Sequence, residues 1–326
     1  MRTLDSNFEE VNLRISCCAY YQETRESNPI DFLISGIFAA QYVNTTNPSF
    51  LVERIEERHD FESMPLLREL SNKINSGCAY GIHNVPDSSF NPFTDEALFR
   101  QYGPLDHFAA KQYNKLFLQE TLGLKMDSKA PVFFWPSRLD RAQKGCQLLA
   151  EILYEVVARY KEQDLQMVFI ADGEFQKYFE EILHVHNLGD RIKVRDFDER
   201  LSRLAYGASD FVLAPSLFEL SGFPLIIGPI YGALPVAYDT GGLNETIVHM
   251  DLKHNTGNGF LFKNFDSTGL RWAIEQAMLF YNCDPQEKQH QIKRVMTQSA
   301  ADLNHGVTVR QYLDLYEKIL QSLLIN

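Results

Sequence analysis

From about residue 131 onward, short apolar runs alternate with longer segments in which apolar side chains recur with the period of an α-helix. The run at 131–136 (PVFFWP) is apolar throughout, which predicts a strand buried on both faces. The segment 143–163 predicts a helix whose buried face carries Leu148, Leu149, Ile152, Leu153, Val156, Val157 and Tyr160. Further strands are predicted at 166–173, 191–197, 210–215, 234–242 and 259–264, and helices at 175–187, at 199–209, from about Leu225, and at 267–281 with Ser267 as N-cap. Continuous apolar strands that alternate with helices indicate an α/β fold with a doubly wound parallel sheet.

The first 130 residues follow a less regular pattern. We predict a helix running into a strand over 31–46, a strand running into a turn over 78–92, and a helix over 107–124. These strands are too few for a second complete doubly wound domain. We therefore predict a partial N-terminal Rossmann-like domain (1–88) and a C-terminal Rossmann-like domain (89–326) that ends in a helix from about residue 309.

Composition narrows the class of protein. The 326 residues are 45% hydrophobic and 23% charged, as in ordinary globular chains of one or two domains. The formal charge of −12 argues against a general nucleic-acid or membrane-surface role, so an anionic ligand would need a local basic pocket. The five cysteines lack metal-ligand spacing, and the chain shows no signal peptide and no run of eighteen apolar residues. We predict a soluble cytoplasmic protein with free thiols.

One acidic residue follows a predicted strand at the edge where doubly wound sheets bind ligands. Glu219 lies beyond the strand at 210–215, and Gly222 precedes a predicted helix. The glycine permits close approach of a bound group, the helix directs free N–H groups toward it, and the carboxylate can accept hydrogen bonds from sugar hydroxyls. A solvated loop glutamate is the alternative interpretation.

Two cations follow the strand at 131–136 in the same way. Arg138 and Lys144 precede a long helix, where charge-assisted hydrogen bonds and the helix dipole together suit a diphosphate. A pair of surface cations is the alternative. Small-residue turns follow two further strands, ADGE at 171–174 and TGG at 240–242. Such features at successive strand ends of one sheet indicate a ligand site more strongly than any one alone.

Other site types lack support in the sequence. His184 and His186 flank one valine, and no further metal ligands accompany them, so we predict no metal site. The chain has no Gly-x-Ser-x-Gly elbow, Walker loop or dinucleotide glycine fingerprint.

These segments resemble the bacterial glycogen synthases and plant starch synthases, retaining glycosyltransferases with two facing Rossmann-like domains of GT-B type. The resemblance runs from about Asp31 to the C-terminus, through DFLISGIFAAQYVNTTNPSF, GIHNVPDSSFNPFTDEAL, KQYNKLFLQETLGL, SRLDRAQKG, SDFVLAPSLFELSG, YGALPVAYDTGGLNETI and GFLF. It implies an acceptor-side role for 1–88 and a nucleotide-sugar-binding role for 89–326, whose last helix would cross back over the domain junction.

The resemblance also implies roles for single residues. Arg138 and Lys144 correspond to the pair that holds the nucleotide diphosphate, and Glu219 to the acid that contacts the donor sugar; these three are the predicted catalytic residues. The predicted donor-binding residues are Asn84 at the domain junction, Phe197 beside the nucleoside base, Ser221, Gly222 and Phe223 through their backbones, and Thr240, Gly241 and Gly242 in a turn near the donor.

The chain departs from the family pattern at several positions. Arg138 and Lys144 are one position further apart than usual, and ELSGF stands in place of EPCGL. Pro224 replaces the threonine of the synthases, and Ile227 lies where the broader retaining class has a second glutamate. Val85 replaces a glycine in the HNVPD turn. The family's amino-terminal KTGGL loop and its acceptor-side histidine motif are absent from these 326 residues.

The resemblance implies a hexosyltransferase that transfers glucose from ADP-glucose or UDP-glucose to an α-1,4-glucan with retention of configuration. The expected partners are this donor and this acceptor, without nucleic acid, membrane, cofactor or metal. A non-catalytic or truncated nucleotide-sugar- or glucan-binding module, or another retaining glycosyltransferase of the same architecture, is the alternative. Because most of the acceptor-side domain is absent, we expect this chain alone to bind nucleotide and to transfer little glucose. The donor base and the oligomeric state stay open.

Overall fold

The computed structural model describes residues 32–46, 64–82, 84–141, 143–219, 222–240 and 246–321. The chain divides into a smaller unit, Met1–His83, and a larger unit, Asn84–Asn326. Each unit is described by itself. No helix within the described ranges is long and apolar enough to cross a membrane.

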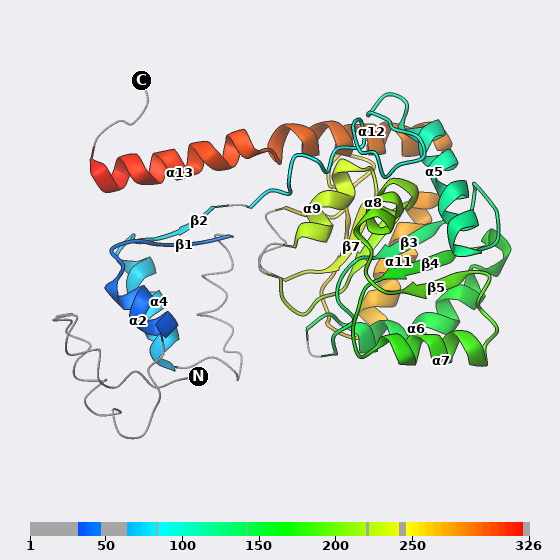
Figure 1. The fold of residues 1–326 in the computed structure, drawn as a ribbon, viewed down its shortest axis with the longest axis horizontal. Helices are drawn as coiled ribbons and strands as arrows, with labels where there is room; N and C mark the ends of the chain where they lie inside the picture. Colours follow the sequence, from blue (N-terminus) through cyan, green and yellow to red (C-terminus); the bar gives the residue numbers. More distant parts are fainter. Residues whose placement is uncertain are drawn as a thin grey trace. The chain divides into compact units, whose positions relative to one another are not determined.

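The smaller unit contains a pair of parallel strands with helices beside them (Figure 1). Its elements are α2 (Phe32–Ala39), β1 (Val43–Thr45), α4 (Met64–Asn75) and β2 (Ala79–Gly81). Val43 of β1 pairs with Ala79 of β2 in parallel register. The predicted helix and strand over 31–46 and the predicted strand at the start of 78–92 are confirmed, whereas α4 was not predicted.

The larger unit is built on a six-stranded parallel sheet with strand order β5-β4-β3-β6-β7-β8. The strands are β3 (Val132–Trp135), β4 (Gln166–Ile170), β5 (Ile192–Arg195), β6 (Phe211–Ala214), β7 (Leu234–Tyr238) and β8 (Phe260–Phe262). The chain proceeds outward from β3 to β5 and then returns to the other side of β3 to build β6 to β8. The strand order therefore reverses between β3 and β6, and the predicted doubly wound α/β fold is confirmed.

Helices cover both faces of this sheet (Figure 1). The helix α6 (Cys146–Arg159) packs on α7 (Gln176–Val185) and on α11 (Ser267–Tyr281), and a short 3₁₀ turn, η1 (Lys161–Gln163), follows α6. On the other face, α5 (His107–Leu122) packs on α8 (Glu199–Ala208), and α9 (Phe223–Ile230) packs on α12 (Pro285–Asp302). The chain then continues into α13 (His305–Leu320). The predicted buried face of α6 is confirmed, except that Tyr160 is only partly buried because it lies at the C-cap, where the helix ends.

One predicted N-cap was wrong, and one helix begins two residues earlier than predicted. The N-cap of α11 is Asp266 rather than Ser267, because Asp266 has extended backbone geometry and its carboxylate accepts from the Gly269 N–H at 2.7 Å. The helix α9 begins at Phe223 rather than near Leu225. Pro224 explains the earlier start, since its fixed φ suits the first turn of a helix and the N–H it lacks is not needed there.

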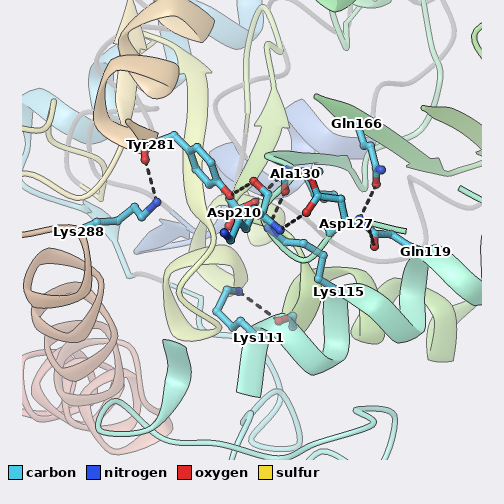
Figure 2. A network of polar contacts seen from close by, with 12 residues as sticks. Lys111, Lys115, Gln119, Asp127, Ala130, Gln166, Asp210, Tyr281 and Lys288 are labelled. Atoms are coloured by element: carbon cyan, nitrogen blue, oxygen red, sulfur yellow. Dashed lines mark hydrogen bonds and ion pairs between the residues drawn. The ribbon is translucent and has the colours of Figure 1, made fainter. Parts of the chain in front are cut away.

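A buried ion pair holds together the amino ends of β3 and β6 (Figure 2). The Lys115 ammonium on α5 lies 2.6 Å from the Asp210 carboxylate, just before β6, and donates to the Ala130 carbonyl, just before β3, at 2.7 Å. The same Asp210 oxygen accepts from the Val132 N–H at 2.9 Å. Because each charge has partners, the pair avoids the penalty of an uncompensated buried ion and fixes the two strands in register.

A second lysine on α5 is buried and makes no ion pair with any residue in the described part of the chain. Lys111 donates to the backbone carbonyls of Gly207 and Tyr231, at 3.2 and 2.9 Å. Burial lowers the pKa of the Lys111 amine to about 7. This side chain therefore links α5 to the ends of α8 and α9.

Candidate active site

The predicted catalytic residues lie on two loops at the carboxyl edge of the sheet. One loop follows β3 and carries Arg138 and Lys144, and the other follows β6 and carries Glu219. The strand order reverses between these two strands, so the chain leaves them toward opposite ends of the sheet. Doubly wound sheets bind their ligands at such a point.

Lys144 and Glu219 form an ion pair across the two loops. The Lys144 Nζ lies 2.5 Å from Glu219 Oε1, and the two side chains are only 11% and 10% exposed. Glu219 Oε1 also accepts a hydrogen bond from Ser216 Oγ at 2.7 Å. The structure therefore excludes the alternatives of a solvated loop glutamate and, for Lys144, of a surface cation.

Backbone contacts hold the two loops against each other. The Leu217 N–H donates to the Gln143 carbonyl at 2.8 Å, and the Gln143 side-chain amide donates to the Phe218 carbonyl at 3.2 Å. Gly145 has φ of +72°, and a Cβ at this position would lie 2.1 Å from the Pro215 oxygen. Only glycine permits this close approach, which sets Lys144 beside Glu219.

Arg138 differs from Lys144 in its surroundings. Its side chain is exposed and makes no ion pair with any residue that the structure describes. The next residue, Leu139, is fully buried, and its N–H donates to the Asp172 carbonyl at 2.9 Å. Arg138 thus extends from an anchored backbone with its charge free to meet an anion.

The loops after β4 and β5 continue this edge of the sheet. Gly173, in the ADGE turn, lies against the Leu139 backbone, where a Cβ would come within 2.3 Å of the Leu139 oxygen. The Asp172 carboxylate accepts from the Phe197 N–H at 2.9 Å, and the Phe197 side chain is 58% exposed. The exposed ring and the exposed guanidinium of Arg138 are thus connected through Asp172 and Leu139.

The start of α9 offers fewer free N–H groups than the sequence predicts. Gly222 adopts φ of +55° at the N-cap, and its carbonyl accepts from the Leu225 N–H at 2.8 Å. Pro224 has no N–H, so Gly222 and Phe223 carry the remaining backbone donors at this end of the helix. The Phe223 ring is 40% exposed.

The other predicted donor-binding residues are only partly placed. Thr240 is buried after β7, and its N–H donates to the Tyr238 carbonyl at 2.9 Å. Asn84 is half-buried at the start of the larger unit, and within the described residues no hydrogen bond joins it to the site. Ser221, Gly241 and Gly242 lie outside the described residues.

Two residues of the site were missed at the level of sequence, Ser216 and Gln143. Ser216 is a polar position in an otherwise apolar stretch after β6, which was the available signal. Gln143 lies immediately before Lys144 and carried no such signal, because glutamine is common on surfaces. Among the residues described, no cluster of three or more His, Cys, Asp or Glu side chains could hold a metal ion, and the His186 ring stacks on Tyr154 at 3.9 Å.

Comparison with known proteins identifies relatives of this site. The family described as "Glycosyl transferases group 1" matches residues 130–279. A glycogen synthase of Acholeplasma laidlawii is 32% identical over 295 residues, covering 89% of this chain and 59% of that protein. A glycogen synthase of Bacillus subtilis is 30% identical over 306 residues, covering 93% of this chain and 60% of that protein. The chain therefore spans about three fifths of the length of the curated relatives it matches.

Solved structures agree with these relatives. The catalytic domain of starch synthase IV from Arabidopsis thaliana, bound to ADP and acarbose, superposes with a TM-score of 0.74 at 29% identity, covering 88% of this chain and 57% of that one. Anabaena Alr3699/HepE, in complex with UDP and glucose, shares the fold with a TM-score of 0.59 at 18% identity, covering 86% of this chain and 64% of that one. The sequence relatives and the starch synthase structure together show that the chain is similar to glycogen and starch synthases over about nine tenths of its own length.

Proposed function

We propose that the larger unit binds a nucleoside diphosphate glucose and that the protein transfers this glucose to an α-1,4-glucan with retention of configuration. The observation that carries the proposal is the Lys144–Glu219 pair at the point where the strand order reverses. A cation for phosphate and an acid for sugar hydroxyls lie side by side there, which suits a ligand that contains both groups. The names of the two curated relatives described above, both glycogen synthases, and the ADP bound to the starch synthase structure support the same ligand class.

The charges at the site suit the electrostatics of glucosyl transfer. The leaving diphosphate gains negative charge while the sugar becomes cationic at its reacting carbon. Arg138 and Lys144 would stabilise the diphosphate, and preorganised groups of this kind are worth about 3–4 kcal/mol each in the transition state. In a protein of net charge −12, Arg138 provides the local positive charge that an anionic donor requires, while the charge of Lys144 is balanced by Glu219 until a diphosphate competes for it.

The remaining predicted donor-binding residues would contact the base and the sugar of the donor. The exposed Phe197 ring would lie along the base, and Glu219 would accept a hydrogen bond from a sugar hydroxyl. The backbones of Ser221, Gly222 and Phe223 would contact the sugar and phosphates, as would the turn of Thr240, Gly241 and Gly242, and Asn84 would face the sugar. The proposed location is the cytoplasm, where buried thiols such as Cys146 stay reduced.

Isothermal titration calorimetry of the 326-residue chain with ADP and with UDP tests the donor site. Arg138→Ala and Lys144→Ala should each weaken nucleotide binding by about 1.5–3 kcal/mol, the range for charge-assisted hydrogen bonds. We expect Lys144→Ala to fall at the upper end, because it also leaves the Glu219 carboxylate buried without its cation. Lys129→Ala is the matched control, since this exposed cation precedes the amino end of β3 rather than following its carboxyl end.

Comparison of the two site variants with Lys129→Ala separates the loss of a specific phosphate contact from a general effect of protein charge on nucleotide affinity. Equal and small losses in all three variants would mean that the nucleotide does not bind between β3 and β6. Unchanged affinity in both Arg138→Ala and Lys144→Ala would remove these residues from the site and leave the proposal without its main support.

A further inference from the structure

The two carboxylate oxygens of Glu219 have different surroundings. Oε1 accepts hydrogen bonds from Lys144 Nζ at 2.5 Å and from Ser216 Oγ at 2.7 Å. Oε2 accepts none from the residues that the structure describes. A carboxylate bound through one oxygen in this way presents the other oxygen in a defined direction.

The position of the Ser216 hydroxyl is more restricted than that of the Lys144 ammonium. It is fully buried two residues beyond the end of β6, whereas Lys144 has a long flexible side chain on the facing loop. The segment around Ser216 is held independently of its hydroxyl, by the Leu217 N–H on the Gln143 carbonyl and the Gln143 amide on the Phe218 carbonyl. Loss of the hydroxyl would therefore release Glu219 and leave the loop in place.

The two partners of Oε1 also differ in what a donor would do to them. The Lys144 ammonium is a point charge with several N–H donors, and a diphosphate competes for it directly. Ser216 is neutral and buried, so an anion has little reason to displace it. Once the diphosphate engages Lys144, Ser216 is the partner that keeps Oε1 in place.

We propose that Ser216 is a positioning residue for the donor sugar: it holds Glu219 Oε1 so that Oε2 accepts a hydrogen bond from a hydroxyl of the sugar. This inference rests on the proposed function and deepens it. Ser216 then governs recognition of the sugar part of the donor and leaves recognition of the nucleotide part to Arg138 and Lys144.

The test compares two ligands, ADP and ADP-glucose, by calorimetry on the full 326-residue chain. Ser216→Ala should change the Kd of ADP little and raise the ratio of the ADP-glucose Kd to the ADP Kd by roughly 10-fold, since a hydrogen bond to a charged group is lost. Ser216→Thr keeps the hydroxyl and should restore the ratio. Ser209→Ala is the matched control, because Ser209 is equally buried beside the same strand and its hydroxyl has no hydrogen-bond partner among the described residues.

If the extra methyl group of Ser216→Thr does not fit at this buried position, a double-mutant cycle of Ser216 and Glu219 still tests the proposal. Glu219→Gln should raise the same ratio, and adding Ser216→Ala to it should raise the ratio little further, because both changes remove one interaction. A wild-type chain that binds both ligands while Ser216→Ala leaves the ratio unchanged would overturn the positioning role alone. Equal weakening of both ligands by Ser216→Ala would also overturn it, since that result indicates a structural role. A wild-type chain that binds neither these two ligands nor UDP and UDP-glucose would remove the proposed function and this inference with it.

Discussion

Gly145 is the position where one added methyl group should disturb both the fold and the donor site. Its φ of +72° lies in the left-handed region, and a Cβ there would lie 2.1 Å from the oxygen and 3.1 Å from the carbonyl carbon of Pro215. Both are backbone atoms, so no side chain can move aside to make room. Gly145→Ala must therefore separate the loop after β3 from the loop after β6.

The cost of Gly145→Ala has two parts. A non-glycine residue in the left-handed region costs about 1–2 kcal/mol. The overlap with Pro215 adds the cost of overpacking, about 1–3 kcal/mol. We expect Gly145→Ala to lower the free energy of unfolding by about 2–5 kcal/mol.

The same change should weaken nucleotide binding. Lys144 is the residue before Gly145, and a shift of this backbone moves its ammonium away from Glu219 and from the phosphate position. The loss should approach that of Lys144→Ala, about 1.5–3 kcal/mol. Substitution of a glycine remote from this edge of the sheet, such as Gly123, should not have this second effect.

Urea denaturation and ADP calorimetry measure the two effects in parallel. Gly123→Ala is the control, because Gly123 has a closely similar φ of +64° and a Cβ there would meet nothing within 4 Å. It carries the same backbone strain, and the same gain from a stiffer unfolded chain, without the overlap. If Gly145→Ala were no less stable than Gly123→Ala and bound ADP like the wild type, the inferred contact between the two loops would be wrong.

Three further predictions follow from buried charges. Glu219→Gln should strengthen ADP binding, by roughly a few-fold, because it removes a negative charge and frees Lys144 for the phosphates; calorimetry showing weaker ADP binding would contradict this. Lys115→Met should lower the free energy of unfolding by about 3–5 kcal/mol, because it leaves the Asp210 carboxylate without its cation, and a loss below ~1 kcal/mol in urea denaturation would show that the pair is dispensable. Lys111 has a pKa of about 7 in the folded protein against 10.5 in the unfolded chain, so the unfolded chain binds more protons above pH 7, and stability should rise from pH 7 toward pH 9. Urea midpoints across this range should rise less in Lys111→Met, and an identical rise would assign the pH dependence to other groups.

The sequence by itself determined the strands of the larger unit and most of its helices, but α12 was not predicted. Each strand except β5 lies inside an apolar run that predicts it, and α11 has the bounds that its apolar period indicates, because burial on a sheet or along a helix face requires such patterns. In the range that predicts β5, charged residues are interspersed with apolar ones. The position of Glu219 just after a strand was also sufficient to place it at the ligand-binding edge of the sheet. The apolar pattern did not decide which of two neighbouring polar residues caps α11. In the structure, Asp266 rather than Ser267 is the N-cap.

Only the tertiary structure decided which of these residues meet. Lys144 and Glu219 are 75 positions apart, and their pairing depends on β6 lying next to β3 rather than beyond β5. The same holds for Lys115 and Asp210 at the opposite edge of the sheet, 95 positions apart. Strand order is set by the packing of whole helices on the sheet, a sum of many weak contacts between distant segments, and no local pattern of residues records that sum.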